Sequence, residues 1–269
     1  MSLVVSLRTA DGIVIAADSL ATVRAQQQIE AEIEVKCPKC DETTKVKLEE
    51  LPPITFPVST FSFSQKVFPF ADSYAVGVFG AAVVNGRTIY SHVRQMESDM
   101  QASVESVDNA AEHVSNYFQK QLRMELGETE LPDKVFPLGV QVVGYRQETG
   151  GEKSPVTIVV RVGNKIESEV LDERFGCTVS GEKGVATKLW DLGREDNRLA
   201  TAYSNFSLQD ALDYAEYLIR TTAEFQRFTN MLPTVGGDID IGLITPYSGF
   251  LWIQQKELAA KLEASTRSG

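Results

Sequence analysis

The sequence has few of the residues and segments that mark several protein classes. It contains 3 cysteines among 269 residues, too few for the disulfide framework of a small secreted domain. No apolar run reaches the roughly 18 residues of a membrane-spanning helix. Asp11 and Asp18 interrupt the N-terminal apolar stretch, where a signal peptide needs an unbroken one. We therefore expect a cytoplasmic protein with no membrane partner.

Basic residues are also scarce. The chain has 26 Lys and Arg against 37 Asp and Glu, a net charge of −11. It thus lacks the basic surface that displaces phosphate counterions, so no nucleic-acid partner is expected. The pairs Gly150-Gly151 and Gly236-Gly237 lack a Walker lysine and the dinucleotide spacing, which indicates turns. No internal repeat is evident, and residues 1–269 are expected to form a single domain.

The N-terminus carries the most informative pattern. Ser2 precedes two apolar runs, 3–8 and 13–18, which are joined across Asp11-Gly12. Equal runs around Asp-Gly predict a β-hairpin whose turn uses a positive φ, and the hairpin returns Asp18 to the side of Ser2. Removal of Met1, expected because a small residue follows it, would give Ser2 a free α-amine. A serine hydroxyl needs an adjacent base, and an α-amine titrates at about 7.7–8.0.

Several further blocks follow in order. These are Lys66-Val67-Phe68, the glycine-containing run that ends in Gly80-Ala81-Ala82, Val179-Ser180-Gly181, and Gly236-Gly237-Asp238-Ile239-Asp240-Ile241. Together with residues 2–22 they resemble the proteasome β-subunit family of N-terminal-nucleophile hydrolases, as a divergent homologue of the bacterial and archaeal type. The likeness runs over most of residues 2–255.

The resemblance implies a fold and a role for each matched residue. The fold is α+β, a four-layer αββα sandwich. Ser2 would be the nucleophile, Lys66 would hold a positive charge beside it, and Asp18 would orient that lysine. Gly80 would offer a backbone N–H to the oxyanion, and Ser180 would support the amine of Ser2. No cofactor is required for such catalysis.

Two departures from the family pattern are visible. The family usually has an aspartate and a serine just before the Gly-Gly strand, whereas residues 230–235 contain no carboxylate. Asn230 or Thr234 would have to substitute. The nucleophile would also be serine, whereas threonine is typical of the family. Serine lacks the methyl group that restricts the rotamers of threonine.

The remaining pattern predicts alternating layers of strands and helices. Strands are expected at about 74–82, 138–146, 156–163 and 166–171. Helices are expected at about 85–103, from Ser106 onward, at 181–193 and at 208–228, the last capped by Ser207 with Asp210 at its third position. His92 and His113 are expected to be surface or boundary residues of the helix pair, not ligands. Residues 256–265 would form a C-terminal helix in a segment, 256–269, that ends in a frayed tail.

An inserted β-rich extension at 24–58 is not part of the family pattern. It contains Cys37-Pro38-Lys39-Cys40 between short strand-like runs, which is half of a zinc ribbon. Structural zinc needs four ligands. Three interpretations stay open: a knuckle that holds no metal, a structural zinc shared between Cys37 and Cys40 of two subunits, and a redox pair.

Three functions are compatible with these residues. The first is a peptidase that acts on peptides or unfolded proteins, self-assembles into rings and works with an ATPase unfoldase, as the resemblance implies. The second is a catalytically silent scaffold subunit, and the third an amidase that acts on small acyl-amides.

Overall fold

The computed structural model describes residues 2–27, 31–36, 43–48, 54–99, 104–230 and 232–256. The chain divides into two compact units, of which the first comprises Met1–Ala21 with Phe61–Gly269 and the second Thr22–Thr60. The predicted C-terminal helix lies outside the described residues, because these end at Lys256. No helix among the described residues is long and apolar enough to cross a membrane.

The first unit contains a five-stranded antiparallel sheet built around the N-terminal hairpin. Its strands, in spatial order, are β14 (Gly176–Gly181), β1 (Leu3–Arg8), β2 (Ile13–Asp18), β15 (Ile239–Thr245) and β16 (Gly249–Gln254). The predicted hairpin forms, with Val4 opposite Ala17. Its turn differs from the prediction, because Gly12 does not adopt a positive φ. The Thr9 hydroxyl closes the turn instead and donates to the Gly12 carbonyl at 2.9 Å.

A second five-stranded antiparallel sheet packs against the first. Its strands, in spatial order, are β13 (Ile166–Leu171), β12 (Lys153–Val162), β11 (Leu138–Gln147), β8 (Tyr74–Gly80) and β7 (Val67–Phe70). A cluster of side chains from both sheets, including Val4, Ile15, Ala75 and Val143, is buried between them. The candidate site lies where β1 begins and where β2 and β8 end.

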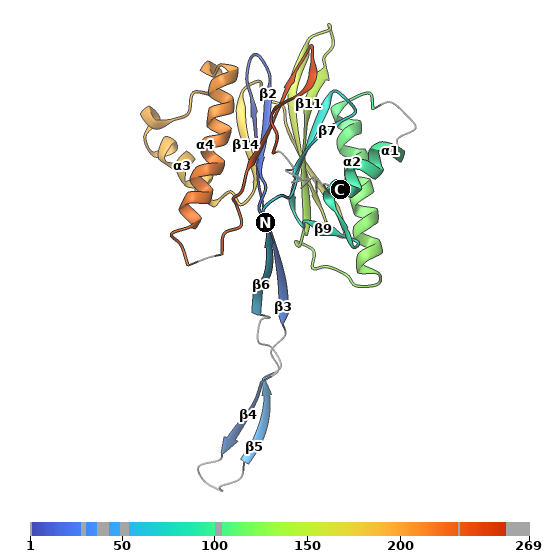
Figure 1. The fold of residues 1–269 in the computed structure, drawn as a ribbon, viewed down its shortest axis with the longest axis vertical. Coiled ribbons are helices and arrows are strands. Elements are labelled where there is room, and N and C mark those ends of the chain that lie inside the picture. Colours follow the sequence, from blue (N-terminus) through green and yellow to red (C-terminus); the bar gives the residue numbers. More distant parts are fainter. Residues whose placement is uncertain are drawn as a thin grey trace, which may run out of the picture. The chain divides into compact units, whose positions relative to one another are not determined.

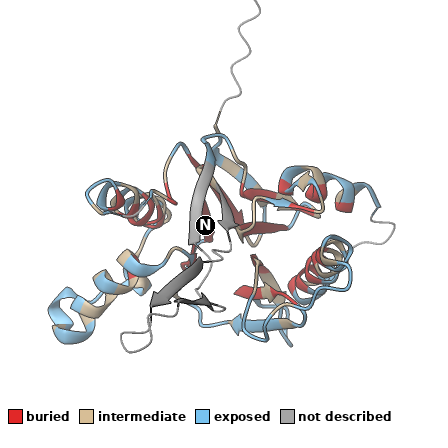
Figure 2. Ribbon diagram, turned by 90° about the horizontal axis from the view of Figure 1, so that it is seen from below, coloured by how far each residue is buried: buried red, intermediate tan, exposed pale blue. Residues whose placement is uncertain are grey.

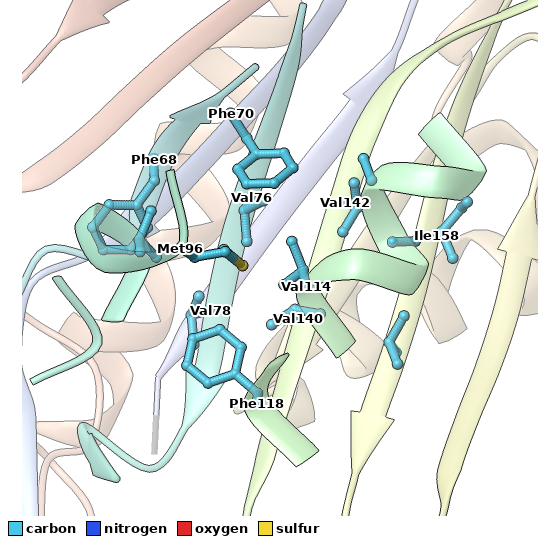
Figure 3. Packing of buried hydrophobic residues seen from close by; sticks show 14 of the residues in the cluster. Phe68, Phe70, Val76, Val78, Met96, Val114, Phe118, Val140, Val142 and Ile158 are labelled. Atoms are coloured by element: carbon cyan, nitrogen blue, oxygen red, sulfur yellow. The ribbon is translucent and has the colours of Figure 1, made fainter. Parts of the chain in front are cut away.

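Helices cover the outer face of each sheet. α3 (Gly184–Glu195) and α4 (Leu208–Gln226) pack on the first sheet, and α1 (Ile89–Asp99) and α2 (Val107–Leu126) pack on the second (Figure 1). The central strands of the two large sheets and the inward faces of the helices are buried, whereas the edge strands β13 and β16 are largely exposed (Figure 2). Figure 3 shows Val114 and Phe118 of α2 among Val76, Val140 and Ile158 of the second sheet. The predicted mixture of helices and antiparallel sheets is confirmed.

Helix boundaries agree with the sequence pattern where a capping residue is present. Ser207 and Asp210 form the predicted capping box at the start of α4, and Ser106 caps α2. The predicted start of a helix at 85 is wrong, since Asn85 and Gly86 adopt positive φ in the turn between β9 (Val83–Val84) and β10 (Arg87–Thr88). α3 likewise begins at residue 184 instead of 181, because 176–181 forms β14.

Two side chains lie differently from the prediction. His92 is fully buried, not at the surface. Its ring nitrogens bond the Val84 carbonyl at 2.8 Å and the Tyr117 hydroxyl at 3.1 Å, which satisfies a polar ring inside an apolar layer. The apolar periodicity over 208–228 predicts that Phe225 lies on the inner stripe of this helix, but Phe225 is 59% exposed. The next residue, Gln226, is the one that is buried at this end of α4.

The described part of the second unit contains two strand pairs. β3 (Ala21–Gln27) pairs with β6 (Ile54–Phe61), and β4 (Ala31–Lys36) pairs with β5 (Thr43–Leu48). The register of β4 and β5 sets Glu32 opposite Lys47 and Glu34 opposite Lys45.

Candidate active site

The carboxylate of Asp18 is the centre of the site. Asp18 is the last residue of β2 and is fully buried. Its Oδ1 accepts the Leu3 N–H at 3.0 Å and the Lys66 ammonium at 2.8 Å. Its Oδ2 accepts the Leu20 N–H at 3.1 Å and the Gly236 N–H at 3.0 Å. Four donors from separate parts of the chain fix this carboxylate in one position.

Lys66 reaches Asp18 from the residue just before β7. Its side chain is 5% exposed, and its ammonium also donates to the Leu20 carbonyl at 2.6 Å. Burial lowers the pKa of Lys66 below its ordinary value, and the charge and hydrogen bond of Asp18 oppose that change. The Lys66 ammonium is therefore buried and paired at the end of the first sheet.

Ser2 lies beside this ion pair. It is 5% exposed and directly precedes Leu3, whose amide shares Oδ1 of Asp18 with Lys66. The carbonyl of Ser2 accepts the Glu182 N–H at 2.8 Å, which ties it to the end of β14. The structure thus gathers Ser2, Asp18 and Lys66 at one end of the sheet.

The end of β14 approaches Ser2 closely. Gly181 has a φ of +86°, and a Cβ on it would lie 1.8 Å from the Ser2 carbonyl oxygen. Ser180 is buried and pairs with Val4 in the sheet. Its hydroxyl oxygen accepts a hydrogen bond from Gln141 of β11 at 2.8 Å. Only glycine at 181 allows this approach.

Gly80 ends β8 on the neighbouring sheet. It has a φ of +98°, and a Cβ there would lie 2.4 Å from the Pro137 carbonyl oxygen. The adjacent Phe79 side chain lies 3.3 Å from the place where a Cβ of Gly181 would be. Phe79 therefore lies near Gly181 at the end of β14. This places Gly80, the next residue, in the same part of the molecule as Ser2.

The turn before β15 shows how the site differs from the family pattern. Gly236 donates to Asp18 and its carbonyl accepts the amides of Ser19 at 3.1 Å and Leu20 at 2.8 Å. Thr234 is buried and bonded to Gln226 of α4, whose amide nitrogen donates to its hydroxyl oxygen at 3.0 Å. Thr234 therefore serves the junction with α4, and a backbone amide, not a carboxylate, faces the site at this turn.

A cavity of about 580 Å³ borders the same turn. Its walls include Leu20, Gly236 and Gly237 from the surroundings of Asp18, together with Arg220 and Lys256. Two of these wall residues donate backbone hydrogen bonds to Asp18. The cavity thus reaches the residues that hold the carboxylate.

Three residues at the site were missed by sequence reasoning. Gln141 is a buried amide in the middle of the valine-rich strand β11, and Asp240 and Lys256 form a second buried ion pair. A polar residue within an otherwise apolar strand was the available signal for Gln141 and Asp240. Lys256 has no such signal, because it follows a strand of mixed exposure.

The cysteines contribute nothing to the described site. Cys37 and Cys40 lie outside the described residues, so the shared zinc stays a prediction. Burial raises the pKa of the Cys177 thiol, which keeps it protonated. Among the residues that the structure describes, no group of three or more His, Cys, Asp or Glu side chains could hold a metal ion.

Known proteins were then compared with this chain. No protein-family model and no curated protein matches the sequence. Solved structures do match: the Anbu (Gly-1) mutant from Hyphomicrobium sp. strain MC1 has a TM-score of 0.55 at 14% identity, covering 98% of this chain and 89% of that chain. The chain shares the Anbu fold.

A second Anbu structure supports the same conclusion. Anbu from Yersinia bercovieri, described as an ancestral beta-subunit, matches with a TM-score of 0.51 at 12% identity and covers 94% of this chain and 87% of that one. At such identities the likeness to Anbu concerns the fold alone. The chemistry of the site must be inferred from its own residues.

Proposed function

We propose that this protein is an N-terminal-nucleophile hydrolase that cleaves peptide bonds with Ser2 after removal of Met1. The observation that carries the proposal is the shared oxygen of Asp18, which accepts both the Leu3 amide and the Lys66 ammonium. It sets a buried positive charge next to the residue that would bear the nucleophile. The Anbu fold, described for one neighbour as an ancestral beta-subunit, supports this proposal.

The proposed mechanism assigns one task to each group. The ammonium of Lys66 has three N–H donors, of which Asp18 and the Leu20 carbonyl engage two. The third is assigned to the Ser2 oxygen, which becomes partly negative during attack. The α-amine of Ser2 takes the hydroxyl proton and later passes it to the leaving amine. Water then hydrolyses the acyl-enzyme, and Gly80 supplies an N–H to the oxyanion.

The family resemblance extends the proposal to the whole protein. Substrates would be peptides or unfolded proteins, subunits would assemble into rings, an ATPase unfoldase would deliver substrate, and the protein would work in the cytoplasm. The α+β architecture would be the four-layer sandwich of N-terminal-nucleophile hydrolases. Ser180 would support the Ser2 amine.

A catalytically silent scaffold is the second candidate. The observation that favours it is the turn before Gly236, where no carboxylate is present and Thr234 is bonded to α4. An amidase that acts on small acyl-amides would use the same nucleophile, and it differs only in substrate.

Peptide hydrolysis by defined variants distinguishes these candidates. Purified protein is first weighed intact to establish loss of Met1, then assayed with fluorogenic peptides and small acyl-amides. Ser2→Ala, which still permits Met1 removal, should reduce turnover by at least about 1000-fold. Lys66→Met should reduce it about 100-fold. Ser2→Thr keeps the hydroxyl and should remain active.

The outcomes separate cleanly. Hydrolysis of small acyl-amides but not of peptides would identify the amidase. A folded, processed protein with no turnover of either substrate would identify the scaffold and contradict the proposed function.

A further inference from the structure

A second buried ion pair lies close to the first. Asp240 is in β15, opposite Ala17 of β2, and Lys256 follows β16. The side chains are 1% and 5% exposed. The ammonium of Lys256 contacts Asp240 Oδ2, and the backbone N–H of Lys256 donates to Asp240 Oδ1 at 2.9 Å. Such a pair adds little stability compared with apolar side chains, because burying both charges is costly.

The lysine of this pair has one more acceptor, and that acceptor lies near Lys66. Lys256 Nζ donates to the carbonyl oxygen of Ser64 at 3.1 Å. The Ser64 N–H in turn donates to the Ser19 carbonyl at 2.9 Å. Ser64 is thereby held on both sides of its peptide backbone, two residues before the lysine that reaches Asp18.

Among the described residues, the segment that carries Lys66 is held mainly by polar bonds. Residues 62–66 lie between β6 and β7 and belong to neither strand. The apolar side chains of Phe61 and Phe63 are 57% and 59% exposed, so they do not anchor the segment by burial. Beyond Ser64, the Lys66 carbonyl accepts the Val78 N–H at 2.8 Å. Polar bonds therefore determine where the backbone of Lys66 lies.

The second pair places two opposite charges near Lys66. Burial is the main cause that lowers the pKa of Lys66, and Asp18 opposes it. Lys256 lowers that pKa further, whereas Asp240 raises it. Because these two effects oppose each other, the pair can anchor the segment without imposing a net charge on it.

We propose that Lys256, held by Asp240, is a positioning residue that fixes residues 64–66 and so places the Lys66 ammonium beside Ser2. The catalytic part of this inference rests on the proposed function. Placement matters because a shift of about 1 Å in a catalytic group can cost about 100-fold in rate.

Two variants separate positioning from stability. Lys256→Met removes the ammonium but leaves Asp240 buried without a partner, so both stability and rate should fall. Adding Asp240→Asn removes that charge, and the midpoint of urea unfolding should recover much of its loss. The rate at which a peptide epoxyketone adds to the N-terminal residue, per folded molecule, should stay about 10- to 100-fold below wild type in both variants.

Arg8→Met is the matched control. Arg8 is a buried cation, 3% exposed at its side chain, and pairs with Glu173 at 3.3 Å. It lies at the opposite end of β1 from Ser2. Its loss should lower the unfolding midpoint and leave the addition rate per folded molecule at the wild-type value.

Hydrogen exchange gives a readout that needs no activity. In both Lys256 variants the Ser64 and Val78 amides should exchange about 10-fold faster than in wild type, since each depends on the anchored segment. In Arg8→Met they should not. Unchanged exchange, or an addition rate that recovers together with stability in the double variant, would overturn the proposal. If wild type adds no probe, the proposed function fails, while exchange still decides whether Lys256 anchors the segment.

Discussion

At the scale of single residues, the site is defined by polar groups that are buried and paired. Asp18 accepts four hydrogen bonds, and Lys66 has two acceptors. A buried charge without partners is expensive, so each of these contacts restricts where the neighbouring groups can lie. Two backbone hydrogen bonds hold Ser2 in place. The Leu3 N–H donates to Asp18, and the Ser2 carbonyl accepts the Glu182 N–H.

The buried amide of Gln141 leads to a prediction about Ser180. Gln141 donates to the Ser180 hydroxyl oxygen at 2.8 Å and to the Val4 carbonyl at 3.3 Å. The Ser180 oxygen is therefore an acceptor in this bond, and its own proton is directed to another acceptor. We assign that acceptor to the amine of Ser2. Gln141→Leu should lower the epoxyketone addition rate about 10-fold.

A double-mutant cycle checks that assignment. Because Gln141 acts through Ser180, adding Gln141→Leu to Ser180→Ala should lower the rate no further. Thr157→Val is the control, since Thr157 bonds Ser6 in the same layer between the sheets and should not affect the rate. Fully additive losses from Gln141→Leu and Ser180→Ala would show that the two residues act independently.

Sequence reasoning found some of these residues and missed others for a physical reason. Ser2 and Asp18 are joined by a short hairpin, so their proximity follows from local pairing rules. The contacts of Gln141 and of Lys256 cross between elements far apart in the chain. Only the packing of the two sheets brings them to the site, and side-chain periodicity does not report that packing.

At the scale of elements, the end of β14 passes so close to Ser2 that Gly181 has no room for a side chain. Gly181→Ala would set a Cβ 1.8 Å from the Ser2 carbonyl oxygen and would impose a φ of +86° on alanine. Either β14 or the start of β1 must then move. We expect a loss of about 2–4 kcal/mol in the free energy of unfolding and a fall of more than about 10-fold in the addition rate.

Gly86→Ala provides the comparison for that variant. Gly86 also has a positive φ, of +70°, but has nothing within 4 Å of its missing Cβ. It should lose only the conformational part, roughly 1 kcal/mol, and keep the wild-type rate. Urea unfolding and the addition rate of both variants test the claim. Equal effects in the two would mean that the contact with Ser2 is unimportant.

The elements themselves were predictable where local signals are strong. The strands expected at about 138–146 and 166–171 correspond to β11 and β13, and the capping box located the start of α4. The failures have a common cause. β9 and β10 have two residues each, too few to carry a periodicity, and β14 pairs with β1, which is distant in the chain, so the local sequence does not report that pairing.

At the scale of the whole molecule, the fold is recognisable although sequence comparison found no match. At 14% and 12% identity to the two Anbu structures, most aligned positions differ although the fold is similar. This is expected when a core requires apolar volume at given positions more than particular side chains. The order of strands in each sheet was not readable from the chain, because it depends on long-range pairing.

The second unit contains the segment for which a shared zinc site is predicted. The sequence predicts an extension at 24–58, and the structure has a compact unit at Thr22–Thr60 in which β4 pairs with β5. The zinc site that would join two copies through Cys37 and Cys40 stays a prediction.

We propose Ser2, as the N-terminal residue, as the nucleophile. The most direct measurement is tandem mass spectrometry of the protein after reaction with a peptide epoxyketone, which locates the adduct on the chain. We expect a single adduct on Ser2 of the Met1-free protein, lost in Ser2→Ala and strongly reduced in Lys66→Met. An adduct on any other residue, or one that survives Ser2→Ala, would contradict it.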